Sequence, residues 1–369
     1  MQITKIEYRQ LALTMKNGFK TANDTTATRP LILIAVTLDD EYIGYGEVQA
    51  FDNHAYATQD QTDALAWLTD TMPSLKNWQG EDINSLLAKL PIDGQFARAG
   101  LEMAVWDAVG KQQNKSLADM LGEHTSSTPV GIALGLDERS EIDDAIQAGY
   151  ERIKLKQQQA NLDELALLVT KYPNQLFSLD YNASLPDTEL THRYLQGVRD
   201  LGINLIEEPF AEPTLDSYHR LANELAPLKV SLDEQLDTVA DVEMWLTQTD
   251  IPAYTLKQGK LGGIQHTLQT MTLIVQANKL AWIGGMLASG LGRAVDAALA
   301  SQLPTPQYPA DISQQTRYFT RDIVQQDLIF EGGKVLVPTG PGIGIELDWP
   351  AIEAQQIGPK YTYNLLQKP

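Results

Sequence analysis

Five short stretches of the sequence decide the fold: RIKLK (152–156), LFSLD (176–180), LIE (205–207), VSLD (230–233) and AYTLK (253–257). Each is an apolar, strand-like segment that ends in a charged residue. By subtraction of the end positions, consecutive ends are 24, 27, 26 and 24 residues apart. Helical patterning fills each gap, so each interval has the length of one βα unit. This period predicts a parallel sheet in which the five charged ends share one edge.

Three further stretches of the same kind extend this pattern on both sides. They lie at Val130–Leu134, Ala281–Gly284 and Tyr308–Asp311, which brings the number of candidate strands to eight. Eight βα units are typical of a closed TIM-like barrel, although such barrels usually take roughly 250 residues. We therefore predict a trimmed α/β barrel, a modified (β/α)7β or (β/α)8, over residues 126–324.

The first 125 residues differ from this pattern and predict an α+β capping domain. Alternating apolar residues predict three antiparallel strands, and apolar stripes at helical spacing predict helices after them. The strands are expected at 3–13, 31–38 and 42–48, and the helices at 59–72, 82–90 and 97–112. The segment Tyr361–Leu366 is expected to pack back on this domain, so that residues from about 325 to 369 complete it.

A polar stretch, Lys16 to Thr28, separates the first two expected strands. It is too long for a tight hairpin, and long polar loops beside a site often act as lids. We therefore expect a loop here that closes over the barrel mouth.

Composition narrows the possible partners. The chain has 369 residues, of which 43% are hydrophobic, and its 28 basic and 48 acidic residues give a net charge of −20. Such a surface repels phosphate backbones and anionic lipids, so we expect no nucleic-acid and no membrane partner. The absence of cysteine excludes thiol nucleophiles and Cys-ligated metals. The start of the chain resembles no signal peptide, so a cytoplasmic location is expected.

The five strand ends together indicate a reaction site. Asp180, Glu207 and Asp233 would lie on the third, fourth and fifth strands, and three carboxylates suit a hard cation such as Mg²⁺, or Mn²⁺ in its place. Lys156 and Lys257 would lie on the second and sixth strands, which are opposite in an eight-stranded ring. Two amines facing each other across a metal-bound carboxylate suit proton removal from the adjacent carbon, because the cation stabilises the enediolate that forms.

At this point the chain resembles the enolase superfamily, muconate lactonising enzyme subgroup, and within it the o-succinylbenzoate synthase and N-acylamino acid racemase branch. The resemblance implies a lysine base that acts together with Mg²⁺, a pairing typical of that superfamily. The motifs that carry the resemblance span essentially the whole chain: Gly44-Tyr45-Gly46-Glu47, Glu102-Met103-Ala104-Val105-Trp106-Asp107, Lys154-Leu155-Lys156, Asp180-Tyr181-Asn182, Ile206-Glu207-Glu208-Pro209, Leu232-Asp233-Glu234, Leu256-Lys257 with Gly262-Gly263, and Gly284-Gly285-Met286.

The resemblance implies roles for individual residues. Lys156 corresponds to the general base and Lys257 to the opposite lysine, while Asp180, Glu207 and Asp233 correspond to the magnesium ligands. The substrate-contacting or supporting residues implied are Lys154, Asn182, Glu234, Met286 and Ser289. One position departs from the family, because Ala288 stands where a glutamate is usual. We expect this change to affect substrate specificity more than catalysis.

The leading functional hypothesis is o-succinylbenzoate synthesis, the syn dehydration of a cyclohexadiene carboxylate in menaquinone biosynthesis. The alternative is racemisation of N-succinylamino acids, or both activities, since the same five residues would serve each. Hypotheses from other classes are a Schiff-base aldolase and a non-catalytic metal-binding barrel. A small carboxylate substrate and a homo-oligomer are expected.

The five histidines fall outside strand ends, and none is expected to be catalytic. Lys260 is expected at the surface.

Overall fold

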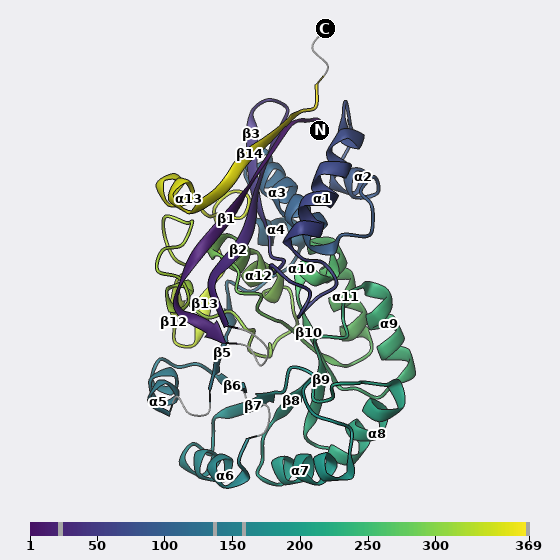
Figure 1. Ribbon diagram of the computed structural model, residues 1–369, viewed down its shortest axis with the longest axis vertical. Helices are drawn as coiled ribbons and strands as arrows, with labels where there is room; N and C mark the ends of the chain where they lie inside the picture. The colour runs from purple at the N-terminus through teal and green to yellow at the C-terminus, as the bar shows by residue number, and fades with distance from the viewer. Residues whose placement is uncertain (21–24, 136–138, 157–159, 367–369) are drawn as a thin grey trace.

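The computed structural model describes residues 1–20, 25–135, 139–156 and 160–366. An antiparallel sheet with helices beside it lies above a parallel sheet that curls into a barrel (Figure 1). This arrangement confirms the predicted combination of an α+β capping domain and a TIM-like barrel. The exact domain boundaries stay a prediction. Within the described residues, no helix is both long enough and apolar enough to cross a membrane.

The capping sheet has four antiparallel strands in the order β14-β1-β2-β3. Its strands are β1 (Ile3–Lys20), β2 (Thr25–Leu38), β3 (Tyr42–Val48) and β14 (Gln356–Asn364). Tyr361 in β14 pairs with Tyr8 in β1, so the C-terminal segment returns to the first sheet as predicted. The helices of this part are α1 (Gln61–Thr71), the 3₁₀ helix η1 (Met72–Leu75), α2 (Ile83–Leu87), α3 (Gln95–Gln113) and α4 (Leu117–Leu121).

Two glycines let α3 lie directly against β3. A Cβ atom at Gly44 would stand 2.0 Å from the carbonyl oxygen of Ala104, and one at Gly46 would stand 2.2 Å from that of Gly100. Contacts this short are impossible, so any side chain at either position would push the helix off the sheet. The Gly-Tyr-Gly-Glu motif therefore fixes the core of the capping domain.

The structure corrects the prediction of a loop from Lys16 to Thr28. β1 continues to Lys20 and β2 begins at Thr25, so the stretch forms most of a long hairpin, and residues 21–24 lie outside the described residues. The hairpin runs from the capping sheet down to the barrel (Figure 1). There the amide of Lys16 donates to the carbonyl of Tyr318 at 2.8 Å. The difference arises because β1 and β2 go on pairing with each other as far as Lys20 and Thr25, which the polarity of this stretch does not indicate.

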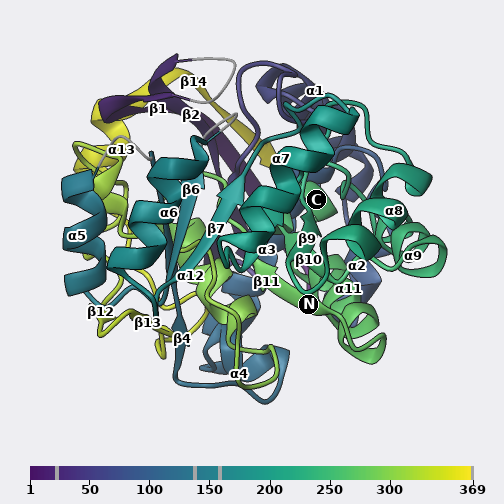
Figure 2. The same cartoon turned by 90° about the horizontal axis from the view of Figure 1, so that it is seen from below.

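The barrel sheet has seven parallel strands in the order β11-β10-β9-β8-β7-β6-β5. They are β5 (Gly131–Leu134), β6 (Arg152–Lys156), β7 (Leu176–Asp180), β8 (Leu205–Glu207), β9 (Lys229–Leu232), β10 (Ala253–Leu256) and β11 (Leu280–Ile283). Figure 2 shows helices around the outside of these strands. They include α5 (Arg139–Gln147), α6 (Leu162–Lys171), α7 (Glu189–Asp200), α8 (Leu215–Leu225), α9 (Val239–Gln248) and α11 (Ile264–Gln276). The other two helices of this part are the short, buried α10 (Gln258–Leu261), which packs against α3, and α12 (Gly290–Ala300).

The eighth predicted strand is a short bridging segment rather than a regular strand. The amide of Gly131 in β5 donates to the carbonyl of Ala310 at 2.8 Å, and the amide of Asp311 donates to the carbonyl of Ile283 in β11 at 2.9 Å. These bonds link the segment to both edges of the seven-stranded sheet and close the barrel. The remaining short elements are β4 (Ser127–Pro129), η2 (Gln315–Arg317), β12 (Phe330–Glu331), β13 (Lys334–Leu336) and α13 (Trp349–Gln355).

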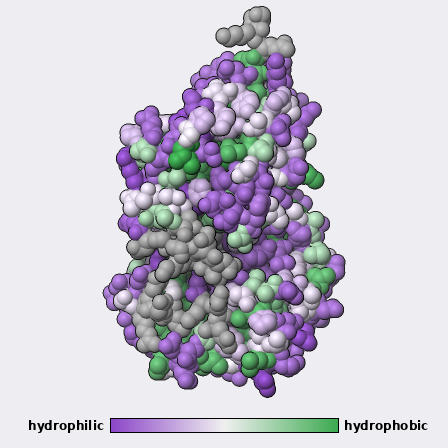
Figure 3. All heavy atoms as spheres, viewed as in Figure 1, coloured by the Kyte–Doolittle hydropathy of each residue, from purple (hydrophilic) through white to green (hydrophobic). Residues whose placement is uncertain are grey.

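Apolar side chains are scattered in small groups over the face drawn in Figure 3, which is mainly hydrophilic. This surface agrees with the acidic composition of the chain, and the site described next lies in the barrel mouth.

Candidate active site

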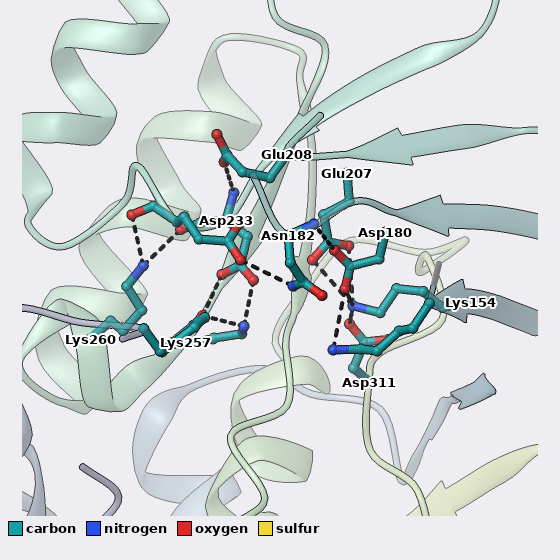
Figure 4. Close-up of polar contacts among 12 residues, drawn as sticks. Lys154, Asp180, Asn182, Glu207, Glu208, Asp233, Lys257, Lys260 and Asp311 are labelled. Atoms are coloured by element: carbon teal, nitrogen blue, oxygen red, sulfur yellow. Dashed lines mark hydrogen bonds and ion pairs between the residues drawn. The ribbon is translucent and has the colours of Figure 1, made fainter. Parts of the chain in front are cut away.

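The charged strand ends meet at the mouth of the barrel. Lys156 pairs in register with Asp180 on the next strand, and Asp180 pairs with Glu207 on the one after. Asp233 follows β9 directly and Lys257 follows β10 directly. The five side chains predicted from strand spacing are thus brought together, because the carboxyl ends of parallel strands open on one side. Figure 4 shows their polar contacts.

Lys154 points into the barrel and is surrounded by carboxylates. Its Nζ lies 3.2 Å from each carboxylate oxygen of Glu207, 3.4 Å from Oδ2 of Asp180 and 2.9 Å from Oδ2 of Asp311. Burial by itself would lower the pKa of Lys154, but these carboxylates outweigh it and hold the pKa well above its usual value. Lys154 is therefore a fixed positive charge beneath the strand ends. Asp311 also binds Arg152.

Lys257 and Asp233 form a second buried ion pair, with Nζ 2.5 Å from Oδ2. Tyr56, in the capping domain, joins this pair: its hydroxyl accepts a hydrogen bond from Lys257 and donates one to Oδ1 of Asp233 at 3.0 Å. Burial would raise the pKa of Asp233, but the charge of Lys257 outweighs it and lowers the pKa below its usual value. A capping-domain residue thus completes the site.

Lys156 differs from Lys257 in its surroundings. Its side chain is 33% exposed, against 7% for Lys257, and its Nζ lies 3.5 Å from Oδ2 of Asp180. Both lysines line one cavity at the barrel mouth. They reach it from β6 and from the end of β10, with β7, β8 and β9 between them in the sheet order. This placement confirms the predicted opposition of the two amines.

Asp180, Glu207 and Asp233 are donors of the type that a hard divalent cation prefers. Among the described residues, however, their oxygens do not all come within 4.8 Å of one another, because each carboxylate is paired with a lysine. Asp180, Glu207 and Asp233 are all nearly inaccessible to solvent. Burial raises the pKa of Glu207 to about 8, aided by the charges of Asp180 and Asp233 and opposed by the charge of Lys154. Glu234 adds a buried Oε2 that has no hydrogen-bond partner within the described residues. Carboxylate oxygens of this kind suit Mg²⁺.

Asn182 and Glu234 support the site together. The side-chain amide of Asn182 donates to Oε1 of Glu234 at 3.1 Å, and its backbone amide donates to Oδ1 of Asp180 at 3.1 Å. Asn182 adopts a left-handed backbone conformation, φ 45°, which asparagine tolerates better than most residues. The pair therefore links the loops that follow β7 and β9, across the end of β8.

A second acidic group, His54, Asp60 and Asp63, has donor atoms within 4.8 Å of one another. Asp60 is the N-cap of α1 and accepts from the amide of Asp63, and the side chain of Asp63 accepts from the amide of Asp60. Helix capping accounts for these two carboxylates, and we assign the group no metal.

Comparison with known proteins agrees with this geometry. The family described as "Enolase C-terminal domain-like" matches residues 137–351, and "Mandelate racemase / muconate lactonizing enzyme, N-terminal domain" matches residues 4–122. Together they cover β2, β3 and nearly all of β1 in the capping sheet, and the five charged strand ends of the barrel. The chain belongs to the enolase superfamily.

Relatives in this superfamily match along nearly the whole chain. An Enterococcus faecalis protein named o-succinylbenzoate synthase is 31% identical over 94% of this chain and 96% of its own length. A Thermus thermophilus protein named N-succinylamino acid racemase is 28% identical over 98% of this chain and 99% of its own. Among solved structures, an enolase-superfamily member from Listeria innocua superposes with a TM-score of 0.91 at 26% identity, covering 99% of this chain and 100% of its own.

Two residues implied by the superfamily resemblance, Met286 and Ser289, lie where the barrel meets the capping domain. The carbonyl of Met286 accepts a hydrogen bond from the buried Arg29 at 3.0 Å. The hydroxyl of Ser289 caps α12 and donates to Glu47 in β3. The structure does not place them against the five charged strand ends, and a part in substrate binding stays a prediction. Ala288, between them, is buried.

Sequence reasoning missed several residues of this site. Tyr56 and Asp311 were not singled out, although Asp311 ends the eighth predicted strand and that position was the available signal. The expectation that Lys260 lies at the surface is wrong. Its Nζ is buried and donates to the carbonyls of Asp233 at 2.9 Å and Glu234 at 3.1 Å, because α10 turns back beneath the loop after β9.

Proposed function

We propose that this enolase-superfamily enzyme is an o-succinylbenzoate synthase, a lyase that removes water from a cyclohexadiene carboxylate in menaquinone biosynthesis. One observation carries the proposal: Lys156 and Lys257 line one cavity from opposite sides, with three buried carboxylates on the strands between them. The names of relatives at about 30% identity support the same reaction.

The residues have separable parts in this reaction. Mg²⁺ held by Asp180, Glu207 and Asp233 would neutralise the substrate carboxylate and make the adjacent proton more acidic. Lys156 removes that proton. Lys257, fixed as an ammonium by Asp233 and Tyr56, stabilises the negative charge from the other side. The protonated Lys156 then returns a proton to the hydroxyl group that leaves from the same face, so that water departs and the ring becomes aromatic.

A second candidate, racemisation of N-succinylamino acids, is supported by the names of other relatives. It requires both lysines to carry protons. The unequal surroundings of the two lysines favour dehydration, since Lys257 is buried in an ion pair and Lys156 is partly exposed.

The test is a direct assay of the purified enzyme with Mg²⁺. Formation of o-succinylbenzoate is followed by its absorbance, and loss of optical rotation of N-succinylphenylalanine is followed in parallel. A catalytic efficiency for dehydration in the range of ordinary enzymes, about 10⁴ M⁻¹s⁻¹ or more, is expected. Racemisation without measurable dehydration would show that the second candidate is correct.

A further inference from the structure

Among the charged side chains that line the cavity at the barrel mouth, cations outnumber carboxylates by four to one. Lys154, Lys156, Lys257 and Arg293 line it, and the carboxylate among its lining residues is Asp311. Asp311 is already bound to Arg152 and Lys154. Such a lining is unusual in a chain of net charge −20 and indicates an anionic occupant.

Two of these cations, Lys154 and Arg293, have no part in the reaction described above, and Lys154 is already paired with carboxylates. Arg293 projects from the first turn of α12 and is only 3% exposed. Its Nε donates to the carbonyl of Ala288 at 3.1 Å and its Nη1 to the carbonyl of Ser313 at 2.7 Å. A guanidinium has five N–H groups, so these two bonds leave donors for a further acceptor.

No carboxylate compensates this buried charge directly. Within the described residues, no carboxylate oxygen forms an ion pair with Arg293 at the 4.0 Å limit. Asp296 is one turn along the same helix, but burial raises its pKa to about 8 despite the charge of Arg293. Asp296 is therefore largely neutral at pH 7. Asp322 also lies near Arg293, and burial raises the pKa of this carboxyl to about 7, so it offsets the guanidinium only in part. A buried guanidinium that has no close ion-pair partner and faces a cavity is well suited to an incoming anion.

The position of Arg293 fits the far end of a substrate. The metal-binding carboxylates are centred on β8, and the closing segment that leads to Ser313 is four positions from β8 around the eight-membered ring, which is the opposite side. Lys156 and Lys257 line the cavity between the metal-side carboxylates and this closing segment. Tyr318, whose ring lies 5.3 Å from the Arg293 guanidinium, and Ser313, whose hydroxyl is 3.0 Å from the Tyr318 hydroxyl, complete this wall.

We infer that Arg293, with Ser313 and Tyr318, forms a subsite for the second carboxylate of a dicarboxylate substrate. The inference rests on the proposed function, because the reacting carboxylate is assigned to the metal side. The printed names of both groups of relatives contain a succinyl group, which carries a second carboxylate. Recognition of that carboxylate is a property both reactions can share.

The test compares ligands that differ only in this carboxylate. Binding of o-succinylbenzoate and 2-butanoylbenzoate to the Mg²⁺-loaded enzyme is measured by calorimetry, and the N-succinyl and N-butanoyl derivatives of phenylalanine form a second pair. We expect the succinyl member of each pair to bind about tenfold more tightly or better, as a charge-assisted hydrogen bond provides. Equal affinities, or no binding of either succinyl ligand, overturn the inference.

Variants assign the preference to Arg293. Arg293→Gln should abolish the preference for the succinyl ligands while leaving the affinity for the butanoyl ligands unchanged. Arg293→Lys should keep part of that preference. Arg317→Gln is the matched control, because Arg317 lies on the same Tyr318 ring, 5.9 Å from its centre, yet pairs with Glu141 and does not line the cavity. A full preference in Arg293→Gln refutes the assignment. If Arg293→Gln does not fold, Arg293→Lys and the wild-type comparison still decide.

The separate dehydration assay distinguishes the two proposals. An enzyme that does not dehydrate but prefers both succinyl ligands refutes the proposed reaction and keeps the subsite. An enzyme that dehydrates without any preference refutes the subsite alone.

Discussion

Lys257 and Asp233, on neighbouring strand ends, form a buried ion pair with 2.5 Å between Nζ and Oδ2. One member is the proposed charge stabiliser and the other a proposed metal ligand. Metal binding and the position of the lysine are therefore coupled through one carboxylate, and the first two predictions follow from this link.

Removal of metal should abolish activity. EDTA treatment and dialysis should reduce dehydration to background, and Mg²⁺ or Mn²⁺ should restore it. The reason is that the proposed reaction needs a divalent cation at Asp180, Glu207 and Asp233. The metal should also raise the melting temperature, since it binds the folded chain. Full activity in metal-free enzyme, or better turnover with zinc, would contradict this prediction.

The two lysines should respond differently to arginine. Lys156→Arg should lower kcat for dehydration by about 10²–10⁴-fold, because a guanidinium cannot act as a base near neutral pH. Lys257→Arg should leave slow dehydration, because it keeps the positive charge beside Asp233. If Lys156→Arg keeps the wild-type rate, the base has been assigned wrongly. If the enzyme is a racemase, both variants should lose racemisation. The remaining lysine in each variant should still exchange the α-proton of one enantiomer for solvent deuterium.

Shortening the β1–β2 hairpin should impair catalysis without loss of metal affinity. The hairpin meets the segment of Tyr318, a cavity-lining residue, through the Lys16 amide. Removing its outer part should admit water and lower kcat/KM, while calorimetry with Mg²⁺ should give an unchanged dissociation constant. Unchanged kinetics in the shortened enzyme would show that the hairpin is not a lid.

Asp296 should make stability depend on pH. Burial raises its pKa to about 8 in the folded chain, against about 4 when unfolded. The folded state then holds a proton that the unfolded state releases, so its contribution is full below pH 4 and is lost as the pH rises towards 8. The slope is at most about 1.4 kcal/mol per pH unit.

The Asp296→Asn variant measures this contribution. The amide cannot ionise, so its melting temperature relative to wild type should increase between pH 5 and pH 8. A constant difference over that range would mean that Asp296 is ionised in the folded enzyme at neutral pH.

Much of the candidate site followed from one local regularity. A charge at the end of each apolar segment, repeated once per βα unit, was enough to bring Lys156, Asp180, Glu207, Asp233 and Lys257 to one mouth. This worked because strand direction, side-chain alternation and unit length are set by nearby residues. Strands β6, β7 and β8 have the predicted bounds.

Contacts between residues far apart in the sequence could not be predicted from any local sequence pattern. Tyr56 reaches Asp233 across 177 positions, and Lys154 reaches Asp311 across 157. The Lys16 amide likewise donates to the Tyr318 carbonyl, a contact that the polarity of the expected loop did not indicate.

The sequence by itself therefore determined the barrel, the family and the five strand-end charges. Only the tertiary structure decided which counter-ions surround those charges, that Lys260 is buried, and that Arg293 faces the cavity. The physical reason is that backbone periodicity is local, whereas the burial and pairing of a charge depend on how the capping domain and barrel close around it.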